Sequence, residues 1–266
     1  MPIVGIDKDK CTKCGLCVNE CPASNITMEG EDGVAMFDPL KPCINCGHCI
    51  AICPTNAVMY KRMKDDALSF EGVQDPSKLI PHETMYQFIR AKRSIRQYKE
   101  DKVPPDMLKK VIDSMRYAPT GTNLRNMKCL VISDAEKIKT LSEEIVNAWS
   151  MTMPGEYSKM LQQKREGDPI FYNAPHVIIL HSKSSSPMDY INAAIAMTYG
   201  MFCAQSLGLG TCWIGLAYII LSQNKELQKK TTGIRGKILG IMSIGYPAVK
   251  YHRAPPRPPL RTKGLN

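Results

Sequence analysis

Eight cysteines near the start of the chain repeat one spacing twice. The stretches CTKCGLCVNECP, which begins at Cys11, and CINCGHCIAICP, which begins at Cys43, both follow C-x2-C-x2-C-x3-C-P. Three thiolates on one tight loop can hold three corners of an iron–sulfur cube, with the fourth cysteine on the short helix that follows. Zinc sites usually use two separated cysteine pairs instead. The spacing therefore favours two iron–sulfur clusters over zinc ions or disulfides.

Residues 1–60, which contain both runs, resemble the bacterial-type two-cluster ferredoxin domain. In such ferredoxins the fourth cysteine of each run ligates the cluster of the other run. A domain of this kind stores one electron per cluster and has no substrate site, so we expect the rest of the chain to contain the electron's destination. The implied ligands are Cys11, Cys14, Cys17 and Cys53 for the first 4Fe–4S cluster, and Cys21, Cys43, Cys46 and Cys49 for the second.

Composition and charge limit the remaining possibilities. The chain has 266 residues, 44% of them apolar, and a net charge of +10 that divides into −3 over residues 1–60 and +13 over the rest. Because no nucleic-acid motif accompanies the basic excess, we expect a solvated surface, an anionic cofactor or an acidic partner rather than nucleic acid. No apolar run of signal-peptide length precedes the cysteines, so we expect a reducing, cytoplasmic compartment.

Residues 61–83 have the composition of a linker, and periodic segments follow over 84–266. Helices and strands are mixed without a regular alternating unit, which predicts an α+β layered domain. The uncharged stretch after Asp189 is interrupted by glycines, so we expect a buried helix and then a strand rather than a membrane span. Ser222 is the expected cap of the last helix. Helices are expected at 83–92, 104–118, 134–149, 155–166, 189–207 and 222–230, and strands at 128–133, 176–181, 211–214 and 238–246.

The stretch KRSIRQY at 92–98 could bind a phosphate group. Arg93 and Arg96 offer charge-assisted hydrogen bonds, and Ser94 lies between them with a hydroxyl. A basic patch at a helix end also interacts favourably with the helix dipole, so the heptapeptide alone leaves both interpretations open.

Three more stretches add to this one: YAPTGTNLRN at 117–126, GLGTCWIG at 208–215 and GYP at 245–247. In this order and spacing, the set resembles the FMN-dependent nitroreductase family over about 84–262. The family's R-[RH]-S-x-[RK], A-P-S-x-x-N and G-[LI]-G-x4-[GE] motifs find counterparts here, with Lys92 for the first Arg and Thr120 for the usual Ser. Arg125 stands where many relatives have Gln, which changes the charge near the flavin ring.

The resemblance implies a homodimer with two FMN molecules at its interface. One group of residues would hold phosphate and ribityl, a second would wall the partner subunit's pocket, and a third would face the flavin ring. These are Lys92, Arg93, Ser94, Arg96 and either Arg257 or Arg253 for the first group, Pro119, Thr120, Gly121 and Asn123 for the second, and Arg125 with the backbone of Ile214 and Gly215 for the third.

The whole chain resembles a ferredoxin–nitroreductase fusion. Such a chain is expected to be an FMN-dependent oxidoreductase that takes electrons from a ferredoxin-type donor, or from NAD(P)H, through the clusters to FMN. The expected acceptor is a nitroaromatic, quinone-like or related electrophilic compound, and the chemistry occurs at FMN, so no catalytic side chain is expected. The alternative is an electron-transfer hub or redox sensor without a dedicated small-molecule substrate.

Overall fold

The computed structural model describes residues 3–30, 33–62, 65, 67–68, 75–152, 155 and 167–264. Its chain separates into two compact units, Met1–Ile80 with Gly121–Leu124, and Pro81–Thr120 with Arg125–Asn266. The helix expected over 155–166 lies outside the described residues except at its first position, and part of the linker expected over 61–83 lies outside them too.

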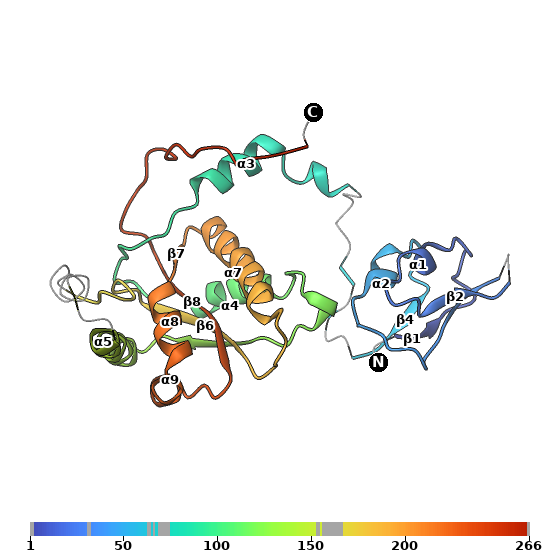
Figure 1. The fold of residues 1–266 in the computed structure, drawn as a ribbon. Coiled ribbons are helices and arrows are strands. Elements are labelled where there is room, and N and C mark those ends of the chain that lie inside the picture. The colour runs from blue at the N-terminus through green and yellow to red at the C-terminus, as the bar shows by residue number, and fades with distance from the viewer. Residues whose placement is uncertain are drawn as a thin grey trace. The chain divides into compact units, whose positions relative to one another are not determined.

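The first unit consists of short strands and two very short helices (Figure 1). Strand β1 pairs antiparallel with β4, and β2 pairs antiparallel with β3. Both helices begin after a glycine in the left-handed region, Gly15 with φ 69° and Gly47 with φ 77°, a conformation that favours glycine. The elements are β1 (Ile3–Ile6), α1 (Leu16–Asn19), β2 (Ile26–Met28), β3 (Ala35–Phe37), α2 (His48–Ile52) and β4 (Val58–Tyr60).

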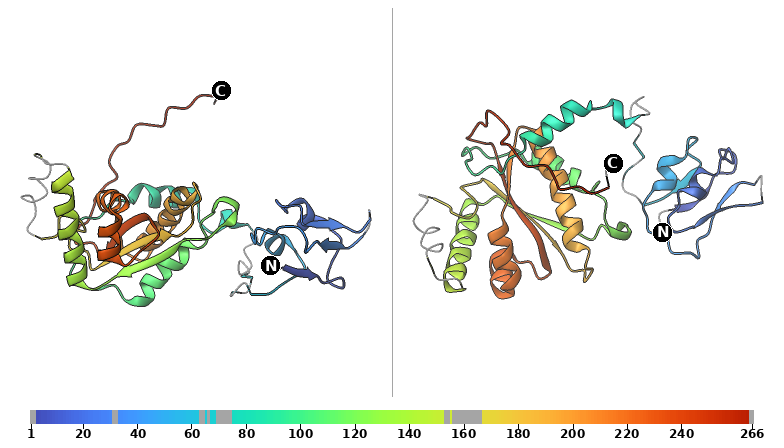
Figure 2. Two further views of the ribbon diagram at one scale, coloured as in Figure 1. Left: turned by 60° about the horizontal axis from the view of Figure 1, so that its bottom comes forward. Right: turned by 45° about the horizontal axis from the view of Figure 1, so that its top comes forward.

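The second unit is built on a four-stranded sheet with the order β5-β6-β8-β7, in which every neighbouring pair is antiparallel. Between its strands the chain forms helices that pack on both faces of the sheet (Figure 2). The strands are β5 (Lys128–Ile132), β6 (His176–Ser182), β7 (Gly210–Trp213) and β8 (Lys237–Gly245). The helices are α3 (His82–Ala91), α4 (Pro105–Met115), α5 (Ala135–Thr152), α7 (Asp189–Ser206), α8 (Gly215–Gln223) and α9 (Lys225–Thr232). Two short 3-10 turns, at Pro76–Lys78 and Gly121–Asn123, belong to the first unit.

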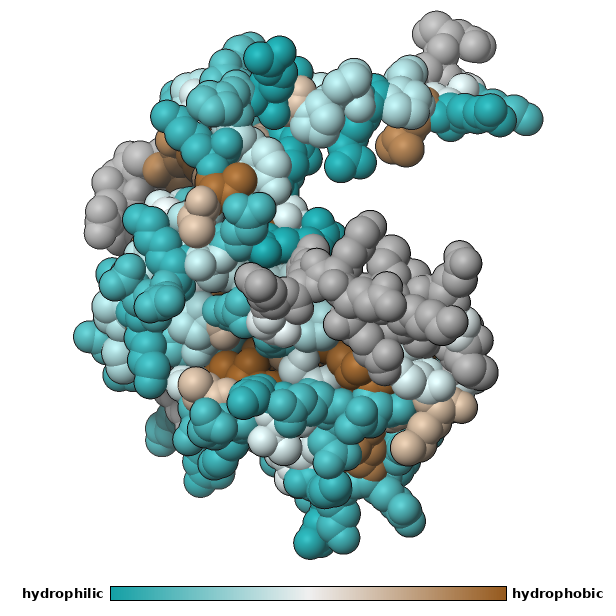
Figure 3. All heavy atoms as spheres, turned by 90° about the vertical axis from the view of Figure 1, so that its left-hand side faces the viewer, coloured by the Kyte–Doolittle hydropathy of each residue, from teal (hydrophilic) through white to brown (hydrophobic). Residues whose placement is uncertain are grey.

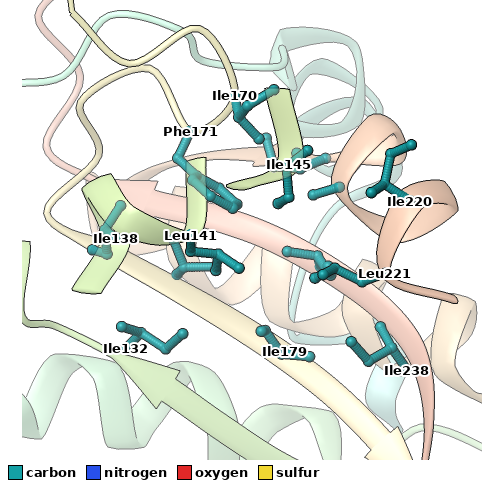
Figure 4. Packing of buried hydrophobic residues seen from close by; sticks show 14 of the residues in the cluster. Ile132, Ile138, Leu141, Ile145, Ile170, Phe171, Ile179, Ile220, Leu221 and Ile238 are labelled. Atoms are coloured by element: carbon teal, nitrogen blue, oxygen red, sulfur yellow. The ribbon is translucent and has the colours of Figure 1, made fainter. Parts of the chain in front are cut away.

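Side chains on the two faces of the central strand β6 belong to two different hydrophobic clusters. Ile179 packs with residues of α5, α8 and α9 (Figure 4), whereas Ile178 and Leu180 pack with residues of α4 and α7. Because successive strand residues point to opposite faces, a strand that is apolar throughout must be covered on both sides. The apolar run HVIILH is therefore explained by the two helical layers.

The structure confirms the α+β class and the expected strands, and it adds two corrections. Residues 215–223 form helix α8, which the sequence analysis missed because its apolar residues lack helical periodicity and resemble a buried strand. Ser222 is not the cap of the following helix: it lies inside α8, where its hydroxyl donates to the Ile219 carbonyl. Asn224 caps α9 instead, and its side-chain oxygen accepts from Leu227 N at 2.9 Å.

Helix α7 corresponds to the long uncharged stretch of the sequence. None of the helices in the described part of the chain is both long enough and apolar enough to cross a bilayer. Figure 3 shows a face of the molecule on which hydrophilic residues predominate and apolar residues form separate patches.

Candidate redox centres

Two small hollows in the first unit each collect four cysteine thiols. Cys21 lines one hollow together with the three cysteines of the second run, Cys43, Cys46 and Cys49. The other hollow is lined by three cysteines of the first run and by the last cysteine of the second, namely Cys11, Cys14, Cys17 and Cys53. Each set of four therefore draws on both runs, as a two-cluster ferredoxin requires.

Electrostatics shows that the thiols of each set lie near one another. Burial raises the pKa of Cys49 to about 11, and the neighbouring thiols Cys46, Cys21 and Cys43 raise it too. Burial likewise raises the pKa of Cys17, with Cys53 among its neighbours. Within the described ranges, no three His, Cys, Asp or Glu side chains are arranged around a single metal ion. Thiols spread around a hollow suit the corners of a 4Fe–4S cube.

Backbone amides donate to the cysteine sulfurs in a pattern that the repeat reproduces. The amide of Asn25 donates to Cys21 Sγ at 3.3 Å, and the amide of Ala57 donates to Cys53 Sγ at 3.2 Å. In both runs the donor lies four residues after the cysteine that precedes the proline. Hydrogen bonds to the sulfurs are one of the factors that set a cluster's reduction potential. The segment after each run therefore orients a thiol and tunes it.

In the second unit, the basic segment 92–96 runs from the end of α3 onto the edge of strand β7. Ser94 forms an isolated parallel bridge with Thr211, and Ile95 N donates to Thr211 O at 3.0 Å. Lys92 Nζ donates to Arg93 O at 2.7 Å and to Thr211 O at 3.4 Å. Burial lowers the pKa of Lys92, and the adjacent Arg93 charge lowers it further. The structure thus brings several of the predicted phosphate-binding residues together on one strand edge.

Two buried polar atoms of this segment have no hydrogen-bond partner among the described residues. They are Arg93 Nε and the hydroxyl oxygen of Thr211, a residue that is 1% exposed. Leaving such groups unpaired costs about 1–3 kcal/mol each, more for a charged group. An anionic oxygen is a suitable partner for an arginine guanidinium, so the donors of this segment, Arg93 with Ser94 and Arg96, fit the phosphate of FMN. Arg96 lies beside it, with its guanidinium 5.7 Å from the ring centre of Tyr172.

The glycine-rich segment explains how β7 approaches the basic segment so closely. A Cβ atom at Gly210 would lie 2.6 Å from Ile95 Cγ1, so only glycine allows this packing. At Gly215, the first residue of α8, a Cβ would meet no atom within 4 Å. The backbone N–H of the preceding residue, Ile214, donates to Ile241 O of strand β8 at 2.8 Å. This leaves open backbone at Gly215, where the resemblance predicts the flavin ring.

The loop between α4 and β5 is held in an unusual conformation. Thr120 Oγ1 accepts from the Arg125 amide at 3.3 Å, and Asn123 and Arg125 have φ values of 53° and 41°, in the left-handed region. Residues 121–124 group with the first unit, where Nδ2 of the Asn123 side chain donates to the carbonyls of Ile44 at 2.9 Å and Asn45 at 2.7 Å.

The roles of these loop residues, including Pro119 and Gly121, in a partner's flavin pocket stay predictions. The role of Arg257 as the last phosphate-binding cation also stays a prediction. Its side chain is exposed on the tail after β8.

One buried contact that the sequence analysis missed fixes the end of this loop. Asp189 is fully buried at the start of α7, and its Oδ1 accepts from Asn126 Nδ2 at 3.0 Å. The hydroxyl of Ser182 donates to the Asn126 carbonyl at 3.2 Å. These bonds anchor the residue that directly follows Arg125. The available signal was an aspartate at the start of an otherwise uncharged helix, but nothing in the sequence identifies its partner 63 residues away.

The fold and these two sets of residues define the class of the protein: a flavin-dependent oxidoreductase domain that follows an iron–sulfur domain. Residues 89–246 match the model of the Nitroreductase family, and residues 3–54 match that of the 4Fe-4S dicluster domain. Because the first match spans more than half of the chain, the protein belongs to the nitroreductase family. It is an FMN-dependent oxidoreductase with an N-terminal ferredoxin domain.

Relatives support the same fold. The chain is 22% identical over 132 residues to an iodotyrosine deiodinase of Thermotoga neapolitana, a match that covers 48% of this chain and 71% of the relative. A nitroreductase with bound FMN from Bacteroides fragilis superposes with a TM-score of 0.60 at 21% identity, covering 67% of this chain and 97% of that one. One from Desulfitobacterium hafniense, also with FMN, gives 0.57 at 17% identity, with coverages of 65% and 93%.

Proposed function

We propose that this protein passes electrons from a low-potential, ferredoxin-type donor through two 4Fe–4S clusters to FMN, and then to a flat electrophilic acceptor such as a nitroaromatic or quinone-like compound. One observation carries the proposal: two hollows, each lined by four thiols from both cysteine runs, occur in the same chain as a nitroreductase domain. When bound, the clusters exchange single electrons and FMN exchanges one or two.

The side chains have the task of holding and tuning these groups. Arg93, Ser94 and Arg96, with half-buried Lys92, would bind the FMN phosphate through charge-assisted hydrogen bonds. The contact from Asn126 to Asp189 would hold the loop that ends at Arg125. No nucleophilic side chain is required. Since all eleven cysteines are unpaired, we also infer a reducing, cytoplasmic setting.

An anaerobic donor screen tests the electron route. We expect reduced ferredoxin to bleach the flavin absorbance band faster than NADH or NADPH does, and to support turnover of menadione or a nitrofuran. A Cys46→Ser variant, which lacks one ligand of the second hollow, should lose most ferredoxin-driven turnover while it keeps its FMN. Clusters that fill with electrons while the flavin stays oxidised would contradict the proposal. Flavin reduction without turnover of any acceptor would favour a redox sensor.

We further propose that the protein is a homodimer. Large apolar side chains on two helices of the second unit are exposed in the single chain: Met85 (37%) and Ile89 (44%) on α3, and Ile191 (53%) and Tyr199 (42%) on α7. The apolar side chains of Met85 and Ile89 on α3 are therefore not covered by the described part of their own chain. Sedimentation velocity should give a mass of about twice 29.7 kDa. A monomer at saturating FMN would contradict this proposal.

A further inference from the structure

A cavity of about 190 Å³ lies in the second unit among α4, β5 and α7, next to the loop that ends at Arg125. Its wall includes the buried side chains of Met115, Leu180 and Ala196, and the partly buried Cys129. An apolar cavity of about 150 Å³ can bind benzene, so this one has room for a six-membered ring with a small substituent.

The charged groups at this cavity all have the same sign. Arg116, Arg125 and Lys128 line it with exposed side chains, and none of the described lining residues is an aspartate or glutamate. Arg116 is paired with Asp113 at 2.8 Å, on the helix turn before it. Arg125 and Lys128 are the other two cations of the lining, and both can meet a ligand's negative charge.

Cys129 does not alter this charge balance. Burial raises the pKa of its thiol to about 11, so the thiol is neutral at pH 7 and acts as a small apolar group. The cavity thus combines an apolar wall with positive charge alone. A carboxylate on a small ring matches both features. An α-amino acid matches them less well, because its ammonium group would add a cation where no carboxylate side chain receives it.

We propose that this cavity binds a small, single-ring molecule with one carboxylate group, with the ring against Met115, Leu180 and Ala196 and the carboxylate toward Arg125 and Lys128. The proposal concerns binding and does not depend on the route of the electrons.

Isothermal titration of the oxidised holoprotein tests this proposal without an electron donor, so a failure of electron transfer does not affect the result. We expect benzoate to bind in the millimolar range or tighter, and benzamide and phenylalanine to bind at least about tenfold more weakly. Lys128→Gln should weaken benzoate binding about three- to tenfold. Lys110→Gln is the matched control, because Lys110 is exposed on α4 but does not line the cavity.

A second variant tests the location of the ring. Cys129→Leu puts a larger side chain into the cavity and should reduce benzoate binding at least about tenfold. FMN absorbance and the thermal midpoint show whether the variant is folded. If it does not fold, the exposed Lys128→Gln and Lys110→Gln pair still decides the outcome. Equal affinities for benzoate and benzamide, or unchanged binding in folded Cys129→Leu, would overturn the proposal.

Discussion

Replacing Cys21 with serine is expected to remove the cluster held by the second cysteine run and to leave the first cluster in place. Although Cys21 belongs to the first run in sequence, it lines the hollow of Cys43, Cys46 and Cys49. A serine hydroxyl is a poor substitute for a thiolate ligand, and the Asn25 amide would lose its sulfur acceptor. Iron should fall from about eight to about four atoms per chain.

Mössbauer and EPR spectra of the reduced protein, with iron analysis, measure this effect. Cys53→Ser is the mirror experiment, because Cys53 lines the hollow of the first run and its loss should remove the other cluster. Cys203→Ser is the control for a thiol outside both hollows: its Sγ donates to Lys110 O at 3.6 Å in the second unit. FMN content should stay unchanged in all three variants. If Cys21→Ser lost the signal of the first-run cluster, the cross-ligation would be wrong.

The cysteine sets illustrate what could be predicted from the sequence. Thiol spacing within one tight loop is a local property, and it limits which cysteines can share a cluster. The apolar run of β6 is equally informative, because five buried residues in succession require cover on both faces. Most of the helices and strands, and the family resemblance, could be predicted from short-range patterns of this kind.

Contacts between distant residues could not be predicted. Asp189 and Asn126 meet only because β5, β6 and α7 converge, and neither residue's neighbours in sequence indicate the other. The carbonyl of Thr211 likewise matters only because β7 runs beside the basic segment, where it accepts from Ile95 N. The error at Ser222 has a different cause: two helices follow each other with one residue between them, and the cap moved to Asn224.

Removing Arg93 and Arg96 together is expected to abolish stable FMN retention. Arg93 has a buried Nε without a partner in the described part of the chain. Arg96 follows three residues later, and Ser94 between them in sequence forms a bridge with Thr211 of β7. Each charge-assisted hydrogen bond contributes about 1.5–3 kcal/mol, so each single alanine variant should weaken FMN binding about tenfold or more. The double variant should weaken it at least about a hundredfold if the two losses add.

Fluorescence titration of the apoprotein with FMN and with riboflavin separates binding of the phosphate from general damage. Because riboflavin lacks the phosphate, its affinity should change little in Arg93→Ala and Arg96→Ala, whereas that of FMN falls. Lys109→Ala is the control for charge, since Lys109 is exposed on α4 and pairs with Asp106 at 3.1 Å. An equal loss of affinity for FMN and riboflavin would mean that these arginines support the fold of the segment rather than the phosphate.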